Sequence, residues 1–159
     1  MSCGLIFFGW LYASGLPPFH TIKSGMYSKA EPHAAALLQC FTVISMVSIV
    51  LIMFRIFHNV EFFEVILVIF SAIAMILGIT MALTQTDFRR MIGYLAVGEL
   101  GFIGLGIGLS TQFAITAGLF QAVNEMITTA LLFLGFGAIA YVTGELSLIH
   151  ISEPTRHLR

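Results

Sequence analysis

Two glutamates and one histidine are the residues of this sequence whose types and positions suit proton exchange. Glu99 and Glu125 each lie inside a long apolar run, and His20 follows two prolines. A charged carboxylate at the centre of a lipid bilayer costs a few kcal/mol, so a carboxyl there is protonated at rest or faces a water-filled cavity. Either state suits a group that takes up and releases a proton. A histidine changes its protonation near neutral pH, although His20 could instead satisfy backbone groups that the prolines leave free.

Both glutamates also have a purely structural explanation. Glu125 could be a neutral acid that hydrogen-bonds to Asn124 or Thr128 and holds helices together. Glu99 could hydrogen-bond to Tyr94 or to a neighbouring helix. Ionisable residues inside a membrane are functional candidates by default, so all three side chains are predicted members of a proton path.

The composition indicates that these residues lie in a membrane protein. Hydrophobic residues make up 58% of the 159 residues and charged residues only 9%, whereas soluble proteins carry about 25% charged residues. A net charge of −1 argues against nucleic acid as a partner, because nucleic-acid binding needs a basic surface. Cys3 and Cys40 form neither a disulfide framework nor a ligand spacing. No motif for a metal, a cofactor or catalytic chemistry is found, so none of these is expected.

The apolar runs predict an all-α, polytopic bundle of about five membrane segments, since a spanning helix needs about 20 apolar residues. No strand alternation competes with this pattern. The first run is short, or is the first half of a helix broken at Pro17 and Pro18. The last is long enough to require tilt, or a break near Asn124 and Glu125. The predicted segments are 5–16, 34–57, 62–83, 91–109 and 113–142.

The basic residues predict how the segments are oriented. The connections at about 20–33 and 84–90 carry four of them, whereas the other two connections carry only Arg55. The first pair of loops is therefore predicted to be cytoplasmic in a multi-pass protein of the cell membrane. The four residues that set this topology are Lys23, Lys29, Arg89 and Arg90.

Individual side chains of these loops have expected roles. Lys23 and Lys29 are expected to anchor the loop at the membrane surface, with their charged ends in water. Asp87 is expected to pair with one of the arginines or to cap the helix that follows it.

The two ends of the chain suggest a fragment. The first apolar run begins almost at Met1, without the basic region of a signal peptide. Near the other end, LSLIHISEPTR (146–156) is similar to the translation of an adapter used in sequencing libraries. We therefore expect one membrane domain over residues 1–145 and a non-native tail over 146–159.

Three sequence blocks carry a resemblance to a known family. They are GLPPFHTIKSGMYSKAEPHAAALL (15–38), QTDFRRMIGYLAVGELGF (85–102) and LFQAVNEMITTALLFLGFGAI (119–139). In order and spacing they resemble the antiporter-like membrane subunits of complex I, Mrp-type cation/proton antiporters and energy-converting hydrogenases. The GLPPFH block is similar to that of hydrogenase-type subunits of methanogens, among them the F component of energy-converting hydrogenase B. The resemblance implies about helices seven to eleven of such a subunit.

The resemblance also implies where a proton path would run. The family places lysines at mid-membrane, and in this sequence their positions fall at Ala13, near Ser45 and at Thr129, while a family histidine falls at Glu125. The path is then either rebuilt around Glu125 and Glu99 or lost. The implied function is a subunit of a redox-driven ion-pumping complex of the hydrogenase or NADH:quinone oxidoreductase type, or of an antiporter, that moves H⁺ or Na⁺. The alternative is a non-conducting structural subunit. Lipid and other membrane subunits are the implied partners.

Overall fold

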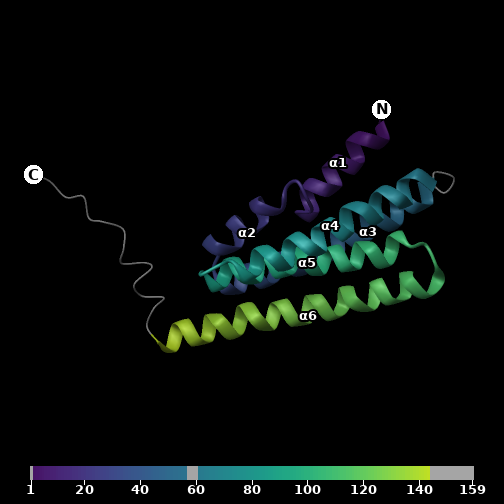
Figure 1. Cartoon of the computed structure of the whole chain (residues 1–159). Helices are drawn as coiled ribbons and strands as arrows, with labels where there is room; N and C mark the ends of the chain where they lie inside the picture. The colour runs from purple at the N-terminus through teal and green to yellow at the C-terminus, as the bar shows by residue number, and fades with distance from the viewer. Residues whose placement is uncertain (1, 57–60, 144–159) are drawn as a thin grey trace, which may run out of the picture.

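The computed structural model describes residues 2–56 and 61–143, which form a bundle of six helices without a strand (Figure 1). The predicted all-α fold class is confirmed for these residues. The helices are α1 (Ser2–Ser14), α2 (His20–Lys29), α3 (Pro32–Ile56), α4 (Glu61–Leu83), α5 (Phe88–Gly108) and α6 (Gln112–Val142). The predicted tail over 146–159 and its boundary lie outside the described residues.

Four of the described helices, α3 to α6, are long and apolar enough to cross a membrane, and α1 adds a shorter apolar stretch. This matches the predicted polytopic bundle with a short first segment. Helix α6 runs uninterrupted over 31 residues, about 46 Å at 1.5 Å per residue. The alternative of a break near Asn124 and Glu125 is therefore not realised, and tilt stays the expected way to fit this length into a hydrocarbon core of about 30 Å.

The first segment breaks where the prolines predicted it. Gly15 adopts a left-handed conformation with φ of 69°, which glycine does without steric cost. The Gly15 amide donates to the Tyr12 carbonyl, and the Leu16 amide donates to the Leu11 carbonyl, which is the hydrogen-bond pattern of a Schellman cap. Leu11 and Leu16 are both fully buried. Helix α1 therefore ends inside the bundle, before Pro17 and Pro18.

The segment 20–33 differs from its prediction as a surface loop. It forms helix α2, which packs against α5, and only residues 30 and 31 separate it from α3. Lys23, Ser24 and Tyr27 lie on its buried side, and the β-carbon position of Gly93 on α5 comes within 3.0 Å of the Ser24 Cα. The segment was predicted as a loop because its apolar content is low. It is buried by its packing against α5, which its composition does not reveal.

Helix α5 occupies the centre of the bundle. Of its membrane span, 67% is buried, against 22% to 33% for the other three spans. Its glycines allow this central position, because small residues let helix backbones approach in lipid. A β-carbon on Gly101 would lie 2.7 Å from both the Ser71 carbonyl oxygen and the Met75 amide nitrogen of α4.

Replacing Gly78 of α4 by valine is expected to destabilise the bundle by about 1–3 kcal/mol, the usual cost of overpacking a filled interior. A β-carbon there would lie 2.6 Å from the Gly98 Cα and 2.9 Å from the Tyr94 carbonyl oxygen, and backbone atoms cannot move aside independently. Thermal unfolding in detergent, followed by circular dichroism, measures the change. Gly9→Val is the matched control, because Gly9 has open space at its β-carbon. Equal destabilisation by both variants would contradict this account.

Three basic residues share one end of the bundle. The α2–α3 and α4–α5 connections both lie at this end, together with the end of α6 (Figure 1). Pro32 and the Arg89 guanidinium contact α6 at Gly137 and Phe136. Lys29, Arg89 and Arg90 are therefore on the same side, away from Arg55. That this side is cytoplasmic remains a prediction.

Candidate functional site

Glu125 lies inside the bundle, near the middle of α6, with only 2% of its surface exposed. The Gln39 amide nitrogen of α3 donates to its Oε1 at 2.9 Å, and the Thr129 hydroxyl donates to the same oxygen at 2.7 Å. Thr129 is four residues further along α6, and residues at this spacing share a helix face. Asn124 and Thr128, the expected partners, are instead exposed on the outer side. No donor among the described residues reaches Oε2, which is therefore the oxygen free to carry a proton.

The buried side chain of Tyr27 extends this site into α2. The Tyr27 hydroxyl donates to the Gln39 Oε1 at 2.6 Å, and neither residue is exposed. Gln39 thus connects Tyr27 to Glu125 with both ends of its amide. Sequence reasoning missed Gln39, although it is the only amide side chain in the predicted segment 34–57, and that would have been the signal.

Lys23 is buried, with 5% of its surface exposed, and its expected position at the membrane surface is wrong. Its ammonium reaches back across the helix break and donates to the Ser14 carbonyl at 3.2 Å. This carbonyl belongs to the last turn of α1, where carbonyls lack partners within the helix. The ammonium lies 5.9 Å from the centre of the Tyr27 ring and interacts electrostatically with Glu125. The break therefore brings a buried cation towards the buried acid.

Glu99 joins the same region from α5. It is half-buried, and its Oε2 accepts a hydrogen bond of 2.7 Å from the Gln121 amide of α6. Gln121 is one turn before Glu125, and the two carboxylates interact electrostatically. The neighbouring-helix alternative for Glu99 is therefore realised, rather than a bond to Tyr94. The structure brings both predicted glutamates together.

His20 is not joined to this group by a hydrogen bond. It starts α2, its Nδ1 is buried without a partner among the described residues, and its ring centre lies 6.4 Å from that of Tyr94. Its proposed place in the path stays a prediction.

The loop residues have local structural contacts. Asp87 caps α5 by accepting the Arg89 amide at 3.0 Å, which is one of the two roles expected of it. The Arg89 guanidinium lies 5.3 Å from the Phe136 ring centre. Lys29 and Arg90 are exposed. None of these side chains contacts Glu125 or Glu99 within the described ranges.

The positions of the family lysines are occupied in three different ways. Ala13 lines a cavity of about 150 Å³ together with Lys23 and Thr42. Ser45 is exposed and donates to the Phe41 carbonyl of its own helix at 2.8 Å. Thr129 donates to Glu125. Of these positions, the first therefore shares its cavity with the Lys23 side chain.

The arrangement is a row of ionisable and hydrogen-bonding side chains across the middle of the bundle. It runs from the α1–α2 break through α3 and α6 to α5, and it contains one cation and two acids. Such a group can hold, release and pass protons, because each carboxyl is kept in place by a neutral donor on another helix. In the part of the chain that the structure describes, no three His, Cys, Asp or Glu side chains are grouped to hold a metal.

Comparisons with known proteins identify the family of this chain. Residues 1–153 match the model of the family described as NADH:quinone oxidoreductase/Mrp antiporter, transmembrane. An uncharacterized protein of Methanocaldococcus jannaschii is 33% identical over 134 residues, which are 82% of this chain and 28% of the relative. No solved structure matches the chain.

Two further relatives have names that state a function. A Na⁺/H⁺ antiporter subunit of Alkalihalophilus pseudofirmus is 31% identical over 91 residues, 57% of this chain and 18% of that protein. The chloroplastic NAD(P)H-quinone oxidoreductase subunit 5 of Piper cenocladum is 28% identical over 154 residues, 97% of this chain and 19% of that protein. This chain therefore spans less than a third of the length of these relatives. It belongs to the NADH:quinone oxidoreductase/Mrp antiporter family of multi-pass, antiporter-like membrane subunits.

Proposed function

We propose that this chain moves protons through buried side chains as part of a membrane subunit of a redox-driven, hydrogenase-type or NADH:quinone oxidoreductase-type complex. The observation that carries the proposal is the set of polar side chains from neighbouring helices that converge on Glu125. A carboxyl that only held helices together would not need a lysine, an amide and a second acid around it. Residues 1–145 would form about helices seven to eleven of such a subunit, with the end that holds Lys29 and Arg90 in the cytoplasm.

In the proposed mechanism Glu125 alternates between protonated and ionised forms. In the ionised form its charge is offset by the Lys23 ammonium, while Gln39 and Thr129 donate to Oε1. In the protonated form Oε2 holds the proton, and the cost of a buried charge is removed. Glu99 is the next acceptor, because its negative charge and that of Glu125 disfavour each other.

The donor set favours H⁺ over Na⁺ as the transported ion. Sodium, a hard cation, prefers oxygen ligands. Gln39 instead presents its amide N–H groups to Glu125, since its oxygen accepts from Tyr27.

The test is ion movement by the complex that contains this chain, isolated from membranes and placed in liposomes loaded with a pH-sensitive dye. A potassium diffusion potential should drive proton uptake at the same rate with and without sodium. Proton uptake that requires sodium would overturn the choice of ion. No uptake beyond that of protein-free liposomes would favour the non-conducting structural subunit, and a proton ionophore added at the end confirms that the liposomes are sealed.

A further inference from the structure

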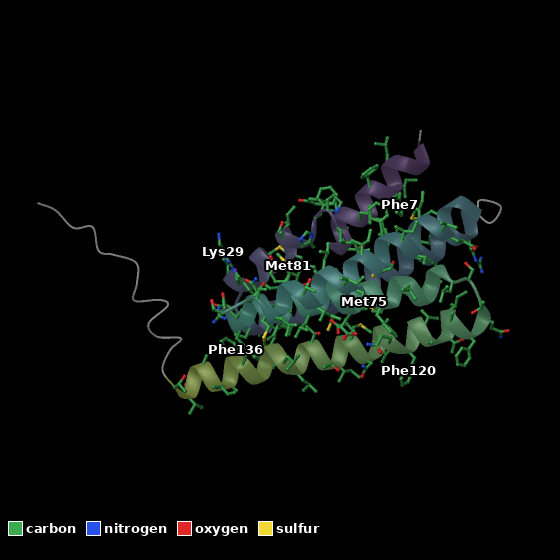
Figure 2. All side chains as sticks on the ribbon, viewed as in Figure 1. Phe7, Lys29, Met75, Met81, Phe120 and Phe136 are labelled. Atoms are coloured by element: carbon green, nitrogen blue, oxygen red, sulfur yellow. The ribbon has the colours of Figure 1, made fainter. Side chains whose placement is uncertain are left out.

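Tyr27 is a buried titratable side chain of this site that the proposed mechanism does not use. Its hydroxyl donates to Gln39, and neither residue has exposed surface. Lys29, two residues later, lies on the other side of α2, and Figure 2 shows it pointing away from the other helices. Because Tyr27, Gln39 and Glu125 are buried within the described helices, their contacts do not depend on what covers the outer faces of the bundle.

Packing fixes where the Tyr27 hydroxyl lies. The ring centre is 5.4 Å from that of Phe133 on α6, and a β-carbon on Gly93 of α5 would lie 3.3 Å from the ring atom Cδ2. The ring is thus held by α5 and α6, with its hydroxyl directed at Gln39 on α3. A phenylalanine ring would keep this packing and its place near the Lys23 ammonium, and would lose only the hydroxyl.

The amide of Gln39 can face in one direction only while Glu125 is ionised. An ionised carboxylate accepts hydrogen bonds and does not donate them, so the amide nitrogen must face Glu125 and the amide oxygen must face Tyr27. The Thr42 hydroxyl lies beside that of Tyr27, but it already donates to the Leu38 carbonyl at 2.8 Å. The Tyr27 hydroxyl is therefore the group that satisfies the Gln39 oxygen.

We propose that Tyr27 is a positioning residue for proton exchange at Glu125: its hydroxyl holds the Gln39 amide with the nitrogen on Oε1, which leaves Oε2 as the oxygen that exchanges the proton. This role rests on the proposed function, in which Glu125 alternates between two protonation states. Tyr27 itself passes no proton to Glu125, because the amide between them is not a titrating group.

Loss of the Tyr27 hydroxyl would act on only one of the two forms of Glu125. When Glu125 is ionised, the Gln39 nitrogen must stay on it, and the amide oxygen would be buried without a donor, which is unfavourable. When Glu125 is protonated, the amide can turn over and accept from the carboxyl instead. The ionised form should therefore become less favourable by roughly tenfold, a typical penalty for one unpaired buried acceptor.

Infrared spectroscopy of the complex that contains this chain tests this shift. The carboxyl band that Glu125→Gln removes belongs to protonated Glu125, and its size against pH gives the pH of half-protonation. In Tyr27→Phe we expect this pH to rise by about one unit, which corresponds to tenfold. Tyr94→Phe is the matched control, because Tyr94 is buried on α5 and its hydroxyl has no hydrogen-bond partner within the described residues. An unchanged value in Tyr27→Phe, or an equal rise in Tyr94→Phe, would overturn the proposal.

A double variant tests whether Tyr27 acts through Gln39. Gln39→Met keeps the length of the side chain but loses the amide, and it should itself raise the pH of half-protonation, because the ionised form loses a donor. Adding Tyr27→Phe should then have no further effect, and full additivity of the two shifts would refute the positioning role. The other charged and titratable groups around Glu125 are unchanged in these variants, namely Lys23 on α2, Cys40 on α3 and Glu99 on α5.

Proton uptake into liposomes supplies the second readout. In Tyr27→Phe its pH profile should move upward together with the infrared value. A rate lowered equally at every pH, without a shift of the profile, would show a purely structural role and overturn the proposal. The infrared band requires no ion movement, so the two failures differ: absence of uptake by the unsubstituted complex would refute the proposed function, whereas an unmoved band would refute the role of Tyr27.

Discussion

Replacing Glu125 by glutamine is expected to abolish proton movement while leaving the bundle and its assembly intact. Glutamine has the same shape, and its carbonyl oxygen can accept from Gln39 and Thr129 as Oε1 does. It cannot release a proton. A positioned proton-transfer group is typically worth 10²-fold or more in rate, so we expect dye-reported proton uptake to fall by about two orders of magnitude. Unchanged uptake in this variant would remove Glu125 from the path.

The same substitution at two other acids calibrates this result. Glu64→Gln is the matched control, because Glu64 is a half-buried acid one turn into α4 and has no contact with Glu125 in the described residues. It should transport normally. Glu99→Gln should give an intermediate loss of proton uptake. The glutamine at position 99 can still accept the hydrogen bond from Gln121, but it cannot accept a proton from Glu125. A uniform loss in all three variants would indicate a general effect on folding, which thermal unfolding would reveal.

The long helices could be predicted from the sequence because their signal is local. Apolar runs of spanning length correspond to α3 to α6, and the break after Gly15 follows from the prolines at 17 and 18. The same reasoning failed for α2. A ten-residue helix with a polar composition reads as a connector, and only its packing against α5 shows which residues are buried.

For the candidate site, too, only the residues with a local signal could be predicted from the sequence. Glu125 and Glu99 could be identified because an acid in an apolar run is visible locally. Their partners could not, since Gln39 is 86 residues away from Glu125, and no local pattern sets that contact. Thr129 is the exception, because its spacing of four residues places it on the same face of α6 as Glu125, whereas Asn124 and Thr128 are exposed. Lys23 follows the rule for snorkelling lysines in sequence, yet the folded-back break turns it inward.

Replacing Lys23 by methionine is expected to slow proton movement by roughly severalfold, because a nearby charge of opposite sign favours the ionised form of a carboxyl, and Lys23 is one of several groups that act on Glu125. Without the ammonium, no other cation of the described residues acts on Glu125, and the protonated form should be favoured. Methionine keeps the apolar stem of the side chain but loses the bond to the Ser14 carbonyl. Lys29→Met on the same helix is the control, because Lys29 is exposed and should be dispensable. Normal transport by Lys23→Met would contradict the role of the ammonium.

A second substitution separates loss of charge from loss of structure. Ala13 lines the cavity that Lys23 also lines, and it stands where the family resemblance places a lysine. Adding Ala13→Lys to Lys23→Met would return an ammonium to that cavity from the α1 side of the break. We expect it to restore a substantial part of the proton uptake, measured per folded complex. A bond that merely caps α1 at Ser14 would not be restored by charge at position 13, so failure of the double variant alongside a lowered unfolding temperature would assign Lys23 to the fold. Rescue would show instead that the buried charge matters more than the residue that carries it.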